Sequence, residues 1–75
     1  MSATPIGNHL RRLRFEHGEL SQEALARAVG VTRQTIIAIE GGRYAPSLEL
    51  AMRLARVFKR GVDEVFFWQE PPPPN

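Results

Sequence analysis

The twenty residues QEALARAVGVTRQTIIAIEG, from Gln22 to Gly41, decide the fold that this sequence predicts. The first half of this stretch has apolar residues at the spacing of one helix face, which are Leu25, Ala26 and Val29. Ser21 precedes them and can accept a hydrogen bond from a free amide at the helix start. Gly30 follows them, and glycine favours the left-handed backbone that ends many helices. We therefore expect a short helix between Ser21 and Gly30.

The second half of the stretch predicts another short helix, with two different faces. Val31 is expected to lie inside the turn, and Thr32 is a candidate N-cap for a helix over 33–40. The face expected to point inward carries Ile36, Ile39 and Glu40. The opposite face carries Arg33, Gln34, Ile37 and Ala38. Two short helices around a tight turn are typical of a helix-turn-helix, which places its second helix in the major groove of DNA.

The outward face of the second helix has the side chains that read base edges. Arginine suits bidentate contacts with guanine, glutamine suits adenine, and an exposed isoleucine suits a thymine methyl group. We therefore expect base contacts from Arg33, Gln34, Ile37 and Ala38. The alternative for Arg33 and Gln34 is a solvated first helical turn.

Four further residues flank that face and are expected to contact DNA phosphates. They are Gln22 at the start of one helix, Thr32 at the start of the next, and Arg43 and Tyr44 in the following loop. Free amides at a helix start favour anions, and such contacts fix orientation without reading sequence. The alternative for Arg43 is a solvated loop cation.

Glu40 falls on the inward face, where a carboxylate needs a partner. Arg14 lies near the edge of the apolar stripe of an earlier helix. We predict an ion pair between Arg14 and Glu40 that links two helices.

The rest of the chain predicts three more helices and no strand. A first helix opens at about Asn8 with Leu10 and Leu13 inward, and His17-Gly18 ends it. Ser47 caps a fourth helix, whose expected inward face is Leu48, Ala51, Leu54, Ala55 and Phe58. A last helical turn follows Gly61. We expect an all-α, compact bundle of five short helices, with an N-terminal arm at 1–7, the helix-turn-helix domain at 8–68 and a disordered Pro-rich tail at 69–75.

Length and composition limit the other classes of function. The chain has 75 residues and no cysteine, so we expect one domain without disulfides. No apolar run is long enough to span a membrane and no signal peptide opens the chain, so a cytoplasmic protein is expected. Residues 1–60 hold all ten Lys and Arg against five acids, a net charge of +5, while 61–75 hold only three acids. A basic body suits an anionic partner.

Catalysis and metal binding are not expected. His9 and His17 lie on one short helix without a nearby acid pair, and Ser21 and Ser47 are explained as helix caps. We expect no cofactor and no small-molecule effector. A competing class is an antitoxin-like or adaptor protein that uses the same fold mainly to bind another protein.

The C-terminal aromatic residues are candidates for contact between two copies. Phe66 is expected in the core, whereas Phe67 and Trp68 are surplus and could form a symmetric dimer interface. The alternative is that both fold back onto their own domain.

The chain resembles the Cro and phage-repressor class of helix-turn-helix proteins, the Xre family. The matching segments are LRRLRFEHG, LSQEALARAVGVTRQTIIAIEGGRYAPSLELAMRLARVF and VDEVF, which cover Asn8 to Phe66. The resemblance implies a lambda-repressor-like fold and a transcriptional repressor that binds a palindromic operator in double-stranded DNA as a homodimer. By position it implies DNA contacts from Gln22, Thr32, Arg33, Gln34, Ile37, Ala38 and Arg43, and an internal ion pair of Arg14 with Glu40.

The chain departs from the family pattern at two places. Gly41 stands where the family commonly has asparagine, and Lys59-Arg60-Gly61 replaces a glycine, an apolar residue and a Ser or Thr cap. We expect the start of the fifth helix to be displaced or loose.

Overall fold

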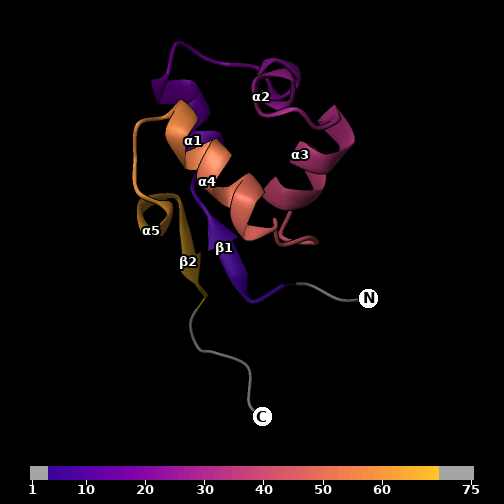
Figure 1. The fold of residues 1–75 in the computed structure, drawn as a ribbon, viewed down its shortest axis with the longest axis vertical. Coiled ribbons are helices and arrows are strands. Elements are labelled where there is room, and N and C mark those ends of the chain that lie inside the picture. The colour runs from indigo at the N-terminus through magenta and orange to yellow at the C-terminus, as the bar shows by residue number, and fades with distance from the viewer. Residues whose placement is uncertain (1–3, 70–75) are drawn as a thin grey trace.

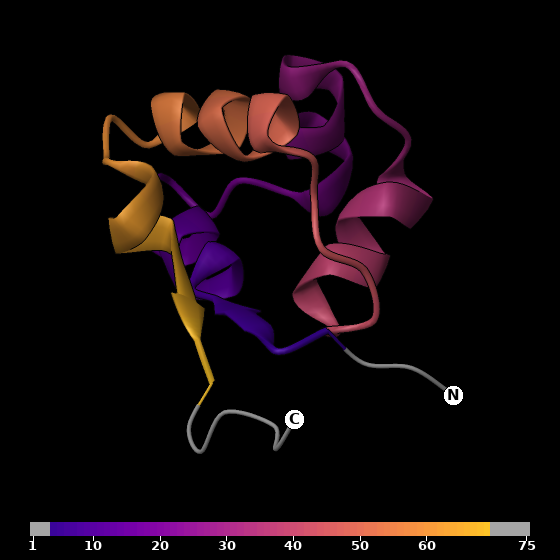
Figure 2. The same cartoon turned by 60° about the horizontal axis from the view of Figure 1, so that its bottom comes forward.

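The computed structural model describes residues 4–69, in which five helices and two short strands follow one another. In chain order these elements are β1 (Ile6–Asn8), α1 (Leu10–Glu16), α2 (Gln22–Val29), α3 (Arg33–Glu40), α4 (Leu48–Val57), α5 (Val62–Val65) and β2 (Phe66–Trp68). Helix α4 crosses the front of the molecule, with α2 and α3 on one side and α5 with β2 on the other (Figure 1). After a 60° turn, α1 is seen below α4, between β1 and the rest of the bundle (Figure 2).

The α2–turn–α3 unit forms as the capping residues predict. Ser21 Oγ accepts a hydrogen bond from the Ala24 amide at 3.0 Å, and Thr32 Oγ1 accepts one from the Thr35 amide at 3.3 Å. Gly30 ends α2 in the left-handed region, with a φ of 81°. Because both helices start on a satisfied amide and the turn between them needs no strained side chain, their relative position is well defined.

The hydrophobic core lies where all five helices meet. Leu10, Leu25, Ile36 and Leu54 are fully buried and come from four different helices, and Val65 adds the fifth. Val31 packs against this core from within the turn. Complete burial of a side chain of leucine size stabilises the fold by about 2 kcal/mol. These contacts hold the inward face of α3, and so its opposite face is presented outward.

The expectation of an all-α fold without strands was wrong in one respect, because β1 and β2 form a two-stranded antiparallel sheet. Ile6 pairs with Trp68, Gly7 with Phe67 and Asn8 with Phe66. Ile6 and Gly7, which the sequence assigned to an N-terminal arm, therefore belong to the folded unit. Residues 1–3 of that arm and 70–75 of the Pro-rich tail lie outside the described residues.

Helix α1 begins at Leu10 and not at Asn8, because the Asn8 side chain makes two other hydrogen bonds. Its Oδ1 accepts a hydrogen bond from the Leu10 amide at 3.1 Å, and its Nδ2 donates one to the Ile39 carbonyl at 2.9 Å. Asn8 thus connects β1 to the first turn of α1 and to the end of α3.

Helix α4 buries the expected face except at one residue, because Leu50 takes the place of Leu48. Leu48 is 72% exposed, whereas Leu50 is buried beside Ala51, Leu54 and Ala55. Ser47 caps the helix as expected, by accepting a hydrogen bond from the Leu50 amide at 3.1 Å. Leu48 is therefore left on the surface, where it lines an apolar groove.

In the link between α4 and α5, a left-handed residue ends α4 and a glutamate side chain caps α5, in place of the missing family residues. Lys59 adopts a φ of 57°, the conformation that glycine usually supplies after a helix, and the Arg60 amide donates to the Ala55 carbonyl at 3.0 Å. The Gly61 amide donates to Glu64 Oε1 at 2.8 Å, which caps α5 without a serine or threonine. The start of α5 is thus defined, contrary to the expectation that it is displaced or loose.

Candidate nucleic-acid interface

Helix α3 divides into the two faces that its sequence suggests. Ile36 and Ile39 are buried, while Arg33 and Gln34 are exposed in the first turn. Ile37 and Ala38, on the same side as Arg33 and Gln34, are half-buried. The helix therefore presents two long polar side chains at its N-terminal end and two smaller apolar ones one turn later.

An ion pair between Arg14 and Glu40 fixes the end of α3 to α1, as the sequence predicted. Arg14 Nε donates to Glu40 Oε2 at 2.7 Å and its Nη2 donates to Glu40 Oε1 at 3.0 Å. The Arg14 and Glu40 side chains are only 14% and 10% exposed. The remaining Arg14 donor, Nη1, reaches the Leu20 carbonyl at 2.9 Å. Because the pair is two-pronged and mostly shielded from water, it orients α3 as well as linking two helices.

Gln22 is tied to the same carboxylate, which sequence reasoning missed. Its Nε2 donates to Glu40 Oε1 at 3.2 Å, and the side chain is half-buried. The two residues are 18 positions apart, and no spacing rule within one helix predicts such a contact. Glu40 thus holds Gln22 at the start of α2 in a set orientation, next to the free amides of that helix.

A shallow hollow lies between α1, α2 and the outward face of α3. Gln22, Arg33 and Ile37 border it together with Arg11 and Phe15, which sequence reasoning did not select. The guanidinium carbon of Arg11 lies 5.9 Å from the centre of the Phe15 ring, within the range of a cation–π contact. The structure therefore brings a predicted phosphate contact and two predicted base contacts to one concave surface. Gln34 and Ala38 lie on α3 outside its lining.

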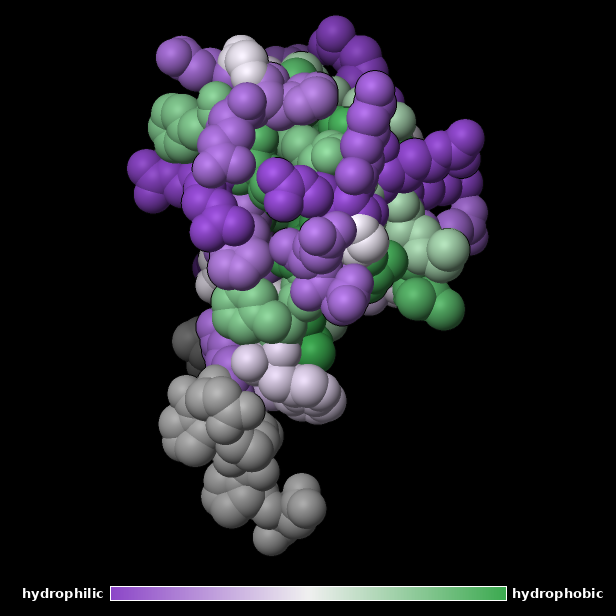
Figure 3. All heavy atoms as spheres, turned by 90° about the vertical axis from the view of Figure 1, so that its left-hand side faces the viewer, coloured by the Kyte–Doolittle hydropathy of each residue, from purple (hydrophilic) through white to green (hydrophobic). Residues whose placement is uncertain are grey.

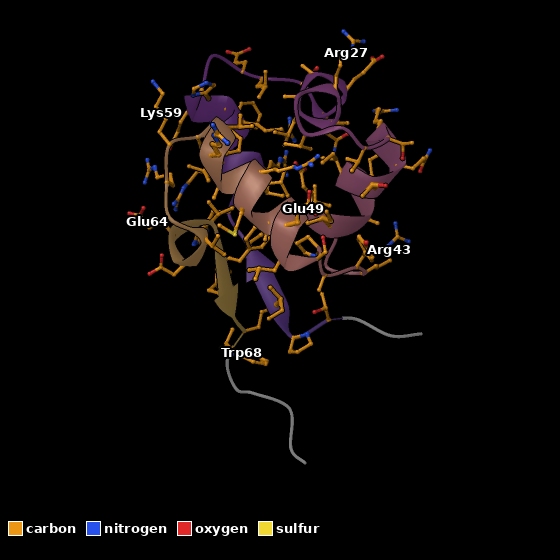
Figure 4. The ribbon with its side chains drawn as sticks, in the orientation of Figure 1. Arg27, Arg43, Glu49, Lys59, Glu64 and Trp68 are labelled. Carbon is orange, nitrogen blue, oxygen red and sulfur yellow. The ribbon has the colours of Figure 1, made fainter. Side chains whose placement is uncertain are left out.

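The loop after α3 holds Arg43 in a fixed backbone geometry. Gly42 has a φ of 75°, and the Arg43 amide donates to the Ala38 carbonyl at 3.0 Å. This closes the C-terminal turn of α3 without the asparagine that the family commonly has at position 41. Arg43 and Tyr44 are exposed, and Arg43 lies beside α3 and far from Lys59 (Figure 4).

The side of the molecule around α3 is rich in free positive charge. Within residues 4–69, Arg11, Arg33 and Arg43 have no ion-pair partner. Unpaired arginines beside a helix with exposed polar side chains form a surface suited to a phosphate backbone.

Thr32 and the two C-terminal aromatic residues are all exposed. Thr32 is exposed, with its hydroxyl oxygen capping α3. Phe67 and Trp68 lie in β2, outside the lining of the hollow. The Phe67 ring is 4.6 Å from the His9 ring, and Trp68 is 61% exposed. Figure 3 shows that hydrophobic side chains lie among hydrophilic ones on the side with α5 and β2.

Two other kinds of site find no support in the part of the chain that is described. None of its helices is long and apolar enough to cross a membrane. Nor do residues 4–69 bring together three or more His, Asp or Glu side chains in an arrangement that could hold a metal ion.

Comparison with known families identifies the class of this fold. The helix-turn-helix family model HTH_3 matches residues 10–65, and the chain therefore belongs to this family. The match covers the ion pair, both helices of the α2–turn–α3 unit and the following loop. The Xre-like resemblance seen in the sequence is thereby confirmed, and with it membership of a DNA-binding class of transcriptional regulators.

Individual relatives have the same character. An uncharacterized HTH-type transcriptional regulator of Methanothermobacter thermautotrophicus is 55% identical over 62 residues, 81% of this chain and 88% of that protein. One from Methanocaldococcus jannaschii is 46% identical over 63 residues, 84% of this chain and 94% of that protein. Among solved structures, the restriction-modification controller protein C.AhdI from Aeromonas hydrophila matches with a TM-score of 0.66 and 36% identity, over 73% of this chain and 78% of that one. None of these names denotes an enzyme.

Proposed function

We propose that this protein is a sequence-specific regulator of transcription that lays α3 in the major groove of double-stranded DNA. The observation that carries the proposal is the division of α3. One face is buried and tied to α1 and α2 through Glu40, and the other presents Arg33 and Gln34 to solvent. A helix held this firmly offers its polar side chains in one orientation, which direct reading of base edges requires.

Within this proposal the residues have separate tasks. Arg33 and Gln34 form bidentate contacts with guanine and adenine, and Ile37 and Ala38 contact apolar groups such as thymine methyls. Phosphate contacts come from Gln22, Thr32, Arg43 and Tyr44. The tie between Gln22 and Glu40 supports this assignment, because it connects a phosphate contact directly to the anchor of the reading helix.

We further propose that the protein acts as a homodimeric repressor on a palindromic operator. A two-fold pair of α3 helices in successive major grooves reads half-sites whose centres are about 34–36 Å apart. Phe67 and Trp68 stay candidates for the contact between the copies. Trp68 supports this by its exposure, whereas Phe67 is already engaged by His9.

Selection of bound fragments from a pool of random double-stranded DNA tests this function. We expect enrichment of one sequence with two inverted half-sites, centred one helical turn apart. Recovery of unrelated sequences, or retention no greater than that of the Glu40→Ala variant, would contradict sequence-specific binding. His17→Ala serves as a matched control, because His17 follows the end of α1, outside the lining of the hollow, and its replacement should leave the selected sequence unchanged.

A further inference from the structure

An apolar groove runs along α4 to the start of α5 and has no role in the DNA interface. Its lining includes Leu48, Met52, Ala55 and Val62, with charged side chains around them. Leu48 is 72% exposed and Met52 is 56% exposed, so neither contributes to the core. Exposed leucine and methionine one helical turn apart, both lining this groove, form the kind of surface that proteins cover with a partner.

The charges along α4 are ordered by sign. One face of the helix carries residues at the spacing i, i+3, i+4 and i+7, and all of them line the groove. This stripe consists of Glu49, Met52, Arg53 and Arg56. The acid is at the N-terminal end and Arg56 at the C-terminal end, followed by Lys59 and Arg60. Within residues 4–69, Arg56, Lys59 and Arg60 have no ion-pair partner, whereas Arg53 is bound to Glu49 at 2.6 Å.

We infer that this groove is the contact between two copies of the chain, with their α4 helices packed antiparallel about a two-fold axis near Met52. In that register Glu49 lies level with Arg56 of the partner subunit, and symmetry repeats the contact at the other end. Leu48 and Met52 of each copy then cover the apolar lining of the other. A parallel arrangement would place the two Glu49 side chains level with each other, so only the antiparallel one brings each Glu49, which its own Arg53 already binds, beside the free Arg56 of the partner subunit.

The position of the groove is compatible with DNA binding. Lys59, at its C-terminal end, and Arg43, beside α3, lie on opposite sides of the molecule (Figure 4). The groove also shares no lining residue with the hollow beside α3, so a second copy seated on α4 leaves the outward face of α3 accessible. The inference rests on the proposed homodimer and supplies the surface that forms it, in preference to Phe67 and Trp68.

Cysteine cross-linking tests the inference directly, because the chain has no cysteine of its own. In an antiparallel pair, the two copies of residue 52 face each other close to the axis. Met52→Cys should form a disulfide-linked dimer rapidly under mild oxidation at micromolar concentration. Trp68→Cys tests the competing surface, and Arg27→Cys, on an exposed part of α2, gives the rate of chance collision. A Met52→Cys rate no higher than that of Arg27→Cys, or a faster Trp68→Cys rate, overturns the inference.

A second measurement uses the free dimerisation equilibrium. Met52→Glu places a charge in the contact and should raise the dimer dissociation constant about 100-fold or more in sedimentation equilibrium. Its circular dichroism spectrum should match the parent, because Met52 is exposed within one copy. Glu49→Arg should weaken the dimer, and adding Arg56→Glu should restore it by exchanging the charges. Unchanged association of Met52→Glu, or a parent that sediments as a monomer throughout, contradicts the inference.

Both measurements contain no DNA, so their failure is distinct from failure of the proposed function. A dimer that cross-links at position 52 but selects no DNA sequence supports the α4 contact and refutes the regulator. A protein that selects single half-sites and stays monomeric supports the sequence-specific regulator and refutes the α4 contact.

Discussion

Glu40 is the residue on which the DNA-facing geometry depends most. Its two carboxylate oxygens accept hydrogen bonds from Arg14 on α1 and Gln22 on α2, while its own backbone ends α3. One side chain thus joins three helices at the edge of the hollow. Its role was predictable from its place on the inward face of α3, since a shielded carboxylate needs a partner. The contribution of Gln22 was not predictable, because it depends on how the helices cross.

Replacement of Glu40 tests this role through stability. Glu40→Ala leaves the Arg14 guanidinium shielded from water without its counter-charge, and should lower the free energy of unfolding by about 2–3 kcal/mol. Urea denaturation at neutral pH measures the loss. Glu16→Ala is the matched control, because its pair with Arg12 is long, at 3.8 Å, and more than half exposed. That control should cost less than about 0.5 kcal/mol. Equal losses in the two variants would show that the Arg14–Glu40 pair is dispensable.

Lys59 offers the opposite kind of test, a substitution that should stabilise. Its φ of 57° lies in the left-handed region, where a side chain is unfavourable and glycine is not. Lys59→Gly should therefore raise the free energy of unfolding by about 0.5–1 kcal/mol. Thermal melts compare it with Arg60→Gly, the neighbouring exposed position outside that region, which should gain nothing. A loss of stability in Lys59→Gly would mean that the side chain makes contacts that outweigh the backbone strain.

At the scale of elements, the helices were predictable and the sheet was not. Ser21, Thr32 and Ser47 mark helix starts by local chemistry, and the structure confirms all three caps. The strands are three residues long and pair positions about sixty residues apart, so no local sequence pattern predicts them. Helix α4 shows a related limit. Its sequence places Leu48 and Leu50 on different faces, and only the direction of its packing decides which of them is buried.

The sheet makes a prediction at Gly7. A Cβ atom there would lie 2.5 Å from Cε1 of Phe67, so Gly7→Ala forces the aromatic ring off His9. The substitution should cost about 1–3 kcal/mol in urea denaturation. In a Phe67→Ala background the clash is removed and the cost should fall by at least half. If both backgrounds show the same cost, the clash with Phe67 is not its source.

At the scale of the whole molecule, paired and unpaired charges are distributed unevenly. Among residues 4–69, Arg11, Arg33 and Arg43 have no ion-pair partner, and Arg43 lies beside α3, whereas Lys59 and Glu64 lie on the other side of the molecule (Figure 4). The modest net charge of +2 hides this arrangement. The sequence located the basic body but not its division into unpaired arginines around α3 and a mixed-charge groove along α4, because that division depends on how the helices are arranged.

The salt dependence of DNA binding tests the phosphate role of Arg43. Arg43→Ala should weaken binding to selected and unrelated DNA alike, and should reduce the slope of log K against log salt by about 1. Fluorescence anisotropy across a salt series measures both. Arg27→Ala, which removes one exposed charge on α2 that lines neither the hollow nor the α4 groove, should leave the slope close to that of the parent. A slope unchanged by Arg43→Ala would remove this residue from the phosphate contacts.

The central claim is that the outward face of α3 reads base sequence, and the base preferences of the parent and Arg33→Ala test it most directly. Both proteins are challenged with every single-base variant of the selected fragment, and their binding free energies are compared position by position. The account predicts that Arg33→Ala loses about 1–3 kcal/mol of discrimination at one position in each half-site and keeps the preferences elsewhere. An identical preference at every position would contradict it.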